Sequence, residues 1–334
     1  MNVFLPAFLP SHWVDTFYLP YIYAPLGTIL SSLSGVVSVS LWDSFWPIFI
    51  VLVLWSLMTM IRKKKERKSA AAHILIMLLF WGNWFFISWG HCYGRTPIDQ
   101  KLGLNLDGLE KEDVVSAYTT IVKEMDVILE ENEQWCAPSD SALMNLFTMQ
   151  MHDQHIPLEV PLTRIKRMTL PSLYIGSGVL GYFGPFFNEV HINSLNYAKD
   201  FPYVILHELS HQQGVGSERD CNFMAFIIGA NAKDSSVRYS VYLNALPYFI
   251  SYFYSLPEIE RKPLLAMIPS IVKKDLRDRH QWYKQKEKKI ASEIQEKAND
   301  LYLKSNGVEH GVMDYGRYFG MIIVWINQNR VSTI

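Results

Sequence analysis

The pentapeptide His207-Glu208-Leu209-Ser210-His211 is the part of the chain best suited to chemistry. Two histidines four residues apart lie on one face of an α-helix, where both imidazoles can bind one Zn²⁺. Glu208 between them can accept a proton from water that the metal activates. The motif therefore predicts a zinc cofactor with His207 and His211 as ligands and Glu208 as the general base.

A catalytic zinc site needs a third protein ligand. Gly214 can end the motif helix, and Ser217 can begin a second helix with Asp220 as its capping-box-like partner. This arrangement leaves Glu218 free in the first turn, so we predict Glu218 as the third ligand. Asp220 is an alternative ligand if it does not cap the helix, and His191 is a second alternative.

Two supporting roles remain to be filled around this site. Asn222 lies one helical turn after Glu218, where it is expected to hydrogen-bond a metal ligand. Peptide hydrolysis also needs a donor for the tetrahedral oxyanion. The sequence does not choose among four candidates for this donor: Tyr315, Tyr239, Arg317 and His310.

Five stretches of the body are expected to form the elements that position the motif. Residues 201–213 and 217–230 fit helices, and 189–193 alternate polar and β-branched residues as a strand does. Residues 113–132 fit an amphipathic helix, and the uncharged stretch 238–256 fits a core helix because Pro247 and several polar residues interrupt it. A further charge-rich stretch, 273–304, fits a solvated helix.

The near-neutral total charge hides an uneven distribution along the chain. The 334 residues carry 31 basic and 32 acidic side chains, which excludes a strongly basic nucleic-acid-binding protein. Residues 1–61 contain no Lys or Arg, and six basic residues then fall within the seven positions 62–68. Residues 95–334 hold the rest of the basic residues and have a net charge of −4.

This distribution predicts a membrane anchor over residues 1–94. Residues 44–61 and 70–90 are uncharged runs long enough to span a lipid bilayer, and the basic residues 62–68 between them are typical of a cytoplasmic loop. Residues 16–42 are broken by Pro and Gly, so we expect an interfacial segment there, with a third span as the alternative. The cell-membrane protein would be multi-pass, with residues 95–334 as one extracytoplasmic domain.

The three cysteines lack a metal-binding spacing. Cys221 is expected to be a small buried residue. Cys92 and Cys136 both fall on the outer side, which leaves a disulfide between them open.

The motif and its surroundings resemble an uncharacterised family of bacterial membrane-anchored proteins. The resemblance rests on HELSHQQGVGSERDCNFMAF, VRYSVYLNALPY, GYFGPFFNEVHIN and NDLYLKSNGVEHGVMDYGR, and with the two spans it covers nearly the whole chain. It implies a zincin-like metallopeptidase of the gluzincin kind, with His207, His211 and Glu218 on zinc. The better-known gluzincins have Asp where this chain has Asn222, and a longer gap before the third ligand.

The resemblance also implies the fold and a place for the substrate. We expect a mainly α protein in which a transmembrane helical hairpin precedes an α-rich α+β zincin-like domain. In such folds an edge strand before the metal helix pairs with an extended peptide, and residues 189–193 are placed for that role. An ordinary core strand is the alternative.

Three functions fit these features. The leading one is a membrane-anchored zinc metallopeptidase that hydrolyses peptide or protein substrates outside the cytoplasm. The second is a catalytically silent, zinc-stabilised scaffold or regulator in cell-envelope assembly. The third, an intramembrane protease, is disfavoured because Asp200 and the charged residues 218–220 leave too short an uncharged run around the motif for a span.

Overall fold

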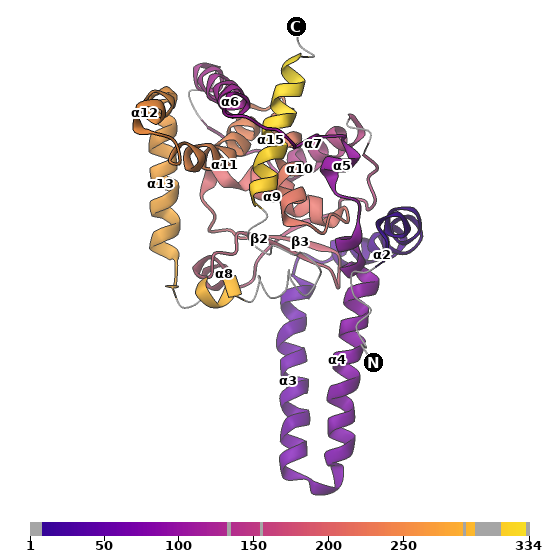
Figure 1. Cartoon of the computed structure of the whole chain (residues 1–334). Helices are drawn as coiled ribbons and strands as arrows, with labels where there is room; N and C mark the ends of the chain where they lie inside the picture. The colour runs from indigo at the N-terminus through magenta and orange to yellow at the C-terminus, as the bar shows by residue number, and fades with distance from the viewer. Residues whose placement is uncertain (1–8, 132–134, 154–155, 290–291, 298–314, 332–334) are drawn as a thin grey trace.

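A computed structural model shows a long helical hairpin that projects from a mainly helical body (Figure 1). The structure describes residues 9–131, 135–153, 156–289, 292–297 and 315–331. A small sheet lies between the base of the hairpin and the central helices of the body (Figure 1). The predicted mainly α architecture is confirmed, with the strands confined to this sheet.

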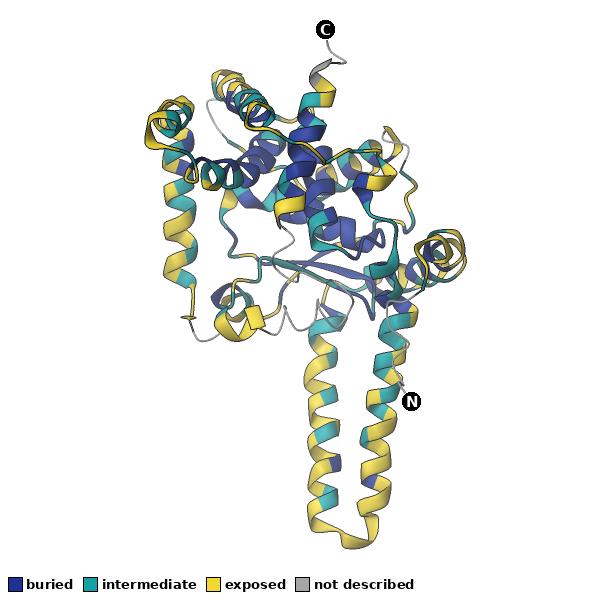
Figure 2. Cartoon of the chain, viewed as in Figure 1, coloured by how far each residue is buried: buried dark blue, intermediate teal, exposed yellow. Residues whose placement is uncertain are grey.

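The hairpin consists of α3 (Leu41–Arg62) and α4 (Arg67–Ser88), joined through the 3-10 turn η2 (Lys64–Glu66). Both helices expose apolar side chains over most of their length (Figure 2). Within the described residues, these are the two helices long and apolar enough to cross a membrane. The helices predicted at 44–61 and 70–90 are thus present, and each begins three residues earlier than expected.

The segment before the hairpin folds onto the body. It comprises α1 (Ser11–Trp13), the π-helix η1 (Val14–Tyr23) and α2 (Ala24–Val36). Four side chains of η1 are buried with residues that follow α4, including those of the 3-10 turn η3 (Gly90–Gly94). Part of the segment expected at the membrane interface, residues 16–42, is therefore packed against the body.

The core of the body is built from helices around the motif. The two helices predicted at the motif are α9 (Phe201–Gln212), which follows the 3-10 turn η4 (Ala198–Asp200), and α10 (Glu218–Ala230). The predicted core helix is α11 (Ser235–Phe253), with most of its side chains buried. These helices bury a continuous apolar cluster with the remaining ones: α5 (Ile98–Lys101), α6 (Lys111–Glu131), α7 (Asp140–Asp153), α12 (Glu258–Met267), α13 (Ser270–Lys286) and α15 (Tyr315–Val331).

The sheet has three strands in the order β1-β3-β2 and a short helix, α8 (Pro171–Gly176), between β1 and β2. Strand β3 (Glu189–Ile192) pairs in parallel with β1 (Ile165–Arg167) and antiparallel with β2 (Gly181–Gly184). The prediction that residues 189–193 form an edge strand is wrong, because β1 occupies the side of β3 that a peptide would need. Strand β2 is the edge strand beside α9.

Buried polar residues fasten the start of α3 to the sheet. We call Ser40, Lys166, Glu189 and His191 the sheet clamp. The Lys166 ammonium donates to the Glu189 carboxylate and to the carbonyl of Val39. The same carboxylate accepts from the backbone N–H groups of residues 41 and 42, at 3.2 and 3.0 Å, and His191 Nε2 lies 2.8 Å from Ser40 Oγ. The hairpin is thus joined to the body by buried bonds as well as by the chain.

Candidate metal centre

Helices α9 and α10 bring three metal-binding side chains to one point. His207 Nε2 lies 3.2 Å from Glu218 Oε2, and His211 Nε2 lies 3.5 Å from Glu218 Oε1. One ligand atom from each of the three residues lies within 4.8 Å of the others. Tetrahedral zinc, with bonds of about 2.0–2.1 Å, places its ligand atoms about 3.3 Å apart. The two distances to Glu218 match this spacing, and the three ligand atoms lie close enough to converge on one ion.

The tight turn between the two helices explains how a short gap supplies the third ligand. Gly214 adopts φ 73°, a left-handed conformation that favours glycine. The turn brings the carbonyl of Val215 to 2.9 Å from His211 Nδ1, so Nδ1 donates and Nε2 is left free for a metal. The Cys221 thiol also lies against His211 Nδ1, at 3.2 Å, and is buried as predicted.

Glu208 lies beside these residues and is buried. Burial raises the pKa of its carboxyl to about 7, against the opposing effect of His207 and His211. Its Oε2 atom has no hydrogen-bond partner among the described residues. A buried carboxylate oxygen without a donor is costly, and a polar ligand in the site would relieve that cost.

The negative charge of Glu218 also favours a bound cation at the centre. Burial would raise the pKa of Glu218, but His211 and His207 outweigh that effect and hold the pKa well below its ordinary value. Burial opposes protonation of His211, whereas Cys221 and Glu218 favour it, and the pKa of His211 lies well above its ordinary value. The ion pairs described for Glu218 are both with histidines, which carry a positive charge only when they are protonated. The donor set and its charge thus fit zinc.

The two alternative third ligands lie elsewhere. His191 belongs to the sheet clamp. The Asp220 carboxylate accepts from the backbone N–H of Ile98 at 3.3 Å and pairs with Arg219. The predicted capping-box pair of Ser217 and Asp220 is wrong, because Ser217 makes no side-chain capping bond.

A tyrosine that the sequence analysis did not single out lies next to the centre. The Tyr203 hydroxyl donates to Asn222 Oδ1 at 2.8 Å, and the Tyr203 and His207 rings are 6.4 Å apart. Burial raises the pKa of Tyr203 well above its ordinary value, so the hydroxyl stays a neutral donor. The prediction that Asn222 bonds a metal ligand is wrong, because its described bond is to Tyr203. The position of Tyr203 one turn before His207 is the signal that could have found it.

Two of the four predicted oxyanion donors are engaged elsewhere. The Tyr239 hydroxyl donates to Asp275, and Arg317 pairs with Asp99. His310 and the side chain of Tyr315 lie outside the described residues. Tyr203, unlike Tyr239, has its ring beside a candidate ligand, His207.

Three side chains from before and after the hairpin satisfy the last carbonyls of α9. Trp89 Nε1 donates to the carbonyl of His211 at 3.0 Å, and the Tyr23 hydroxyl donates to that of Gln212 at 2.7 Å. Arg95 Nη1 donates to the carbonyl of the next residue at 2.7 Å. Helix ends leave carbonyls without partners in the helix. The segments on either side of the hairpin therefore hold the end of the helix that carries His207 and His211.

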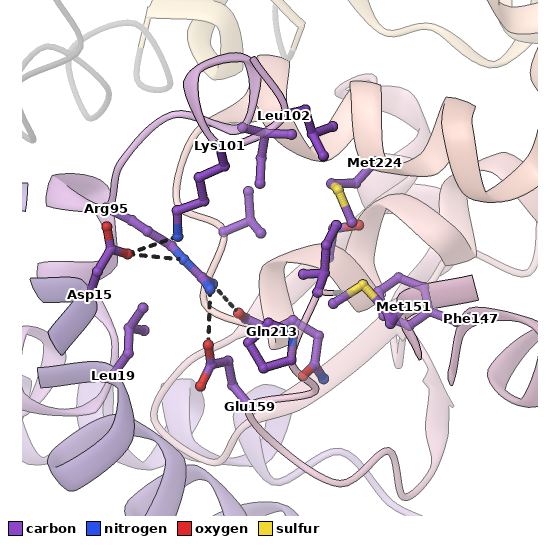
Figure 3. A pocket seen from close by; sticks show the side chains of 15 residues that line it. Asp15, Leu19, Arg95, Lys101, Leu102, Phe147, Met151, Glu159, Gln213 and Met224 are labelled. Carbon is purple, nitrogen blue, oxygen red and sulfur yellow. Dashed lines mark hydrogen bonds and ion pairs between the residues drawn. The ribbon is translucent and has the colours of Figure 1, made fainter. Parts of the chain in front are cut away.

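A cavity of about 360 Å³ lies between η1 and another face of α9 (Figure 3). Its interior is mainly apolar, and charged groups stand at one side. Arg95 pairs with Glu159 at 2.9 Å, and Lys101 pairs with Asp15 at 2.9 Å. The cavity is separate from the candidate metal centre, because its described lining includes neither of the motif histidines nor Glu208 or Glu218. Its ion pairs join the N-terminal segment to the body.

The other two cysteines are not bonded to each other. Cys92 is buried and Cys136 is exposed, and both are free thiols. A disulfide between them is therefore not part of this structure.

Comparisons with known proteins identify the family. No curated protein and no solved structure matches the chain. One family model matches the chain over residues 18–323, a range that includes the hairpin, the sheet and the candidate metal centre. Its description is "Protein of unknown function (DUF3810)". The match covers most of the sequence, so the chain belongs to the DUF3810 family.

Proposed function

We propose that the protein is a membrane-anchored zinc metallopeptidase that hydrolyses peptide bonds outside the cytoplasm. The observation that carries this proposal is the geometry at α9 and α10. Three zinc-type donors converge there, and a buried carboxylate beside them has an oxygen without a described partner. The side chain of Glu218 is 41% exposed, so the centre is open on that side.

Four side chains have separate roles in the proposed hydrolysis. His207, His211 and Glu218 would hold zinc, which as a Lewis acid makes a bound water acidic and polarises a carbonyl. Glu208 Oε2 would accept a proton from the attacking water and deliver it to the leaving amine. The pKa of Glu208, about 7, suits a group that must both accept and release a proton near neutral pH.

A zinc-stabilised scaffold is the alternative function. It would use the same three ligands, because structural zinc also holds helices together. It has no use for Glu208, whose buried carboxyl costs stability without a described partner for Oε2. The position of Glu208 therefore favours the enzyme.

Membrane topology follows from charge. The basic residues at the far end of the hairpin favour the cytoplasmic side, which places the body on the outside. Protease added to intact cells should then digest the body and spare the tip of the hairpin. Digestion of the tip with protection of the body would reverse the proposed orientation.

The replacement Glu208→Gln tests the enzyme. We expect peptide hydrolysis to fall about 10²–10⁴-fold, because the amide cannot accept the proton, while bound zinc is unchanged. The assay is mass spectrometry of a peptide library incubated with the full chain in detergent, beside elemental analysis. Glu112→Gln, an exposed change on α6, is the matched control. Equal hydrolysis by the Glu208 variant and the wild type would exclude Glu208 as the base.

A further inference from the structure

Strand β2 connects the metal centre directly to the membrane hairpin. At its first residue, Gly181, an added Cβ would lie 2.6 Å from Glu208 Oε1. At its last residue, Gly184, an added Cβ would lie 3.1 Å from the ring of Trp42, in the first turn of α3. One end of this short strand is therefore at the general base and the other end is at the membrane helix.

The hairpin end of β2 carries the features of a membrane interface. Phe186, in the turn after β2, packs against Trp42 at 5.0 Å and stacks on Trp81 of α4 at 5.1 Å between ring centroids. Trp46 also contacts Phe186, at 6.3 Å. Tryptophans gather where a spanning helix leaves the hydrocarbon, so this cluster marks the outer surface of the bilayer. Beyond it, α3 exposes a continuous apolar surface (Figure 2).

The length of β2 limits the distance between the metal centre and the membrane interface. Four residues of extended chain cover about 10 Å at roughly 3.3 Å per residue. The sheet lies across the top of the hairpin (Figure 1), so a polypeptide lying along β2 would pass from Glu208 to Trp42 in about three or four residues and stay near the interface.

Buried hydrogen bonds fix the distance between the metal centre and the membrane interface. The sheet clamp holds the start of α3 to β3, and the Tyr182 hydroxyl of β2 donates to Asp43 of α3. Trp84 Nε1 of α4 donates to the carbonyl of Phe186 at 3.3 Å. Both membrane helices thus bond to the β2–β3 hairpin, and the metal centre is held at one distance from the bilayer.

Strand β2 also offers an edge to such a chain. It pairs with β3 on one side, and in the described residues its other edge has no strand partner. An exposed strand edge binds extended peptides through its backbone N–H and C=O groups. The edge begins next to the general base and leads to the membrane surface.

We propose that the substrates are integral membrane proteins, cut in an extended segment within a few residues of the outer end of a membrane span. This proposal rests on the proposed peptidase function and names its substrate class. The class follows from a cleavage centre that lies about 10 Å along a four-residue edge strand from Trp42 at the interface.

Mapping of protein termini tests the substrate class. Cells that contain the full-length wild type are compared with cells that contain Glu208→Gln, and membrane and secreted fractions are analysed by mass spectrometry of new N-termini. We expect wild-type-specific termini within about three or four extended residues of the outer end of a membrane span, and their complete loss in the variant. Zinc analysis of the purified variant shows that it is folded at the centre.

The outcomes separate this inference from the function on which it rests. Glu208-dependent termini that lie mainly in soluble proteins, or far from any span, would overturn the membrane-proximal substrate class and leave the peptidase in place. An absence of Glu208-dependent termini would overturn the peptidase and this inference together.

Discussion

The metal centre and the sheet clamp both contain His and Glu side chains, and they differ in what compensates the carboxylates. In the clamp, Lys166 and two backbone N–H groups compensate the carboxylate of Glu189. At the metal centre, Glu218 faces two histidines, and Glu208 Oε2 has no described partner. Buried His and Glu side chains alone therefore do not indicate a metal site. The unpartnered Glu208 Oε2 beside three convergent donors is the feature that supports the proposed zinc site.

This difference assigns separate roles to the two clusters. Substitutions in the clamp should lower the free energy of unfolding, because they leave a buried charge without its partner. Changes at the metal centre should remove zinc or activity and leave the fold largely intact. Each prediction below tests whether the two clusters can be separated in this way.

The largest expected effect is on stability, from Lys166→Met in the clamp. The change removes the ammonium partner of the buried Glu189 carboxylate, which costs about 3–5 kcal/mol of unfolding free energy. Denaturant unfolding of the full chain in detergent measures this loss. The exposed Lys274→Met, which breaks the pair with Asp278 on α13, should change nothing measurable. Loss of zinc from the Lys166 variant while it remains folded would contradict the separation of the clusters.

A smaller effect is expected where the sheet meets the metal centre. Gly181→Ala places a methyl group 2.6 Å from Glu208 Oε1, and the crowding should cost about 1–3 kcal/mol of unfolding free energy. Because the clash falls on the base, hydrolysis should fall while the zinc content stays at the wild-type level. Gly316→Ala, with open space around it, is the control. Unchanged hydrolysis in the Gly181 variant would place β2 away from the reacting groups.

The smallest effect is expected at the end of α9 that the segments on either side of the hairpin hold. Trp89→Phe removes the bond to the carbonyl of His211 and should cost about 0.5–1.5 kcal/mol of unfolding free energy. Zinc affinity should weaken by less than about tenfold, since the ligand itself stays. Trp282→Phe loses a similar bond, to the carbonyl of Leu195 at 2.9 Å, far from α9 along the chain. Equal zinc affinity in the two variants would show that Trp89 does not support the centre.

The sequence predicted the parts of the site that depend on local spacing. His207 and His211 share a helix face because of the i, i+4 geometry, and Glu218 follows from a glycine turn and a helix start within a few residues. The predicted helices 113–132 and 238–256 also appear, since their apolar periodicity or uncharged length is a local signal.

The parts that were missed depend on contacts between distant segments. Strand β1 is three residues long, too short for a periodicity signal, and its pairing makes β3 a central strand. Asp220 bonds the backbone of Ile98, 122 residues away, rather than capping its own helix. The bond from Trp89 to the carbonyl of His211 likewise has no local signature. Such contacts follow from the assembled fold.

The central claim is that zinc occupies the metal centre and not the clamp. The direct measurement is elemental analysis of the full chain purified in detergent, as the wild type, His207→Ala and His191→Ala. We predict about one zinc per chain in the wild type and in folded His191→Ala, and none in His207→Ala. A folded, metal-free wild type, or zinc that survives His207→Ala and is lost in His191→Ala, would contradict the account.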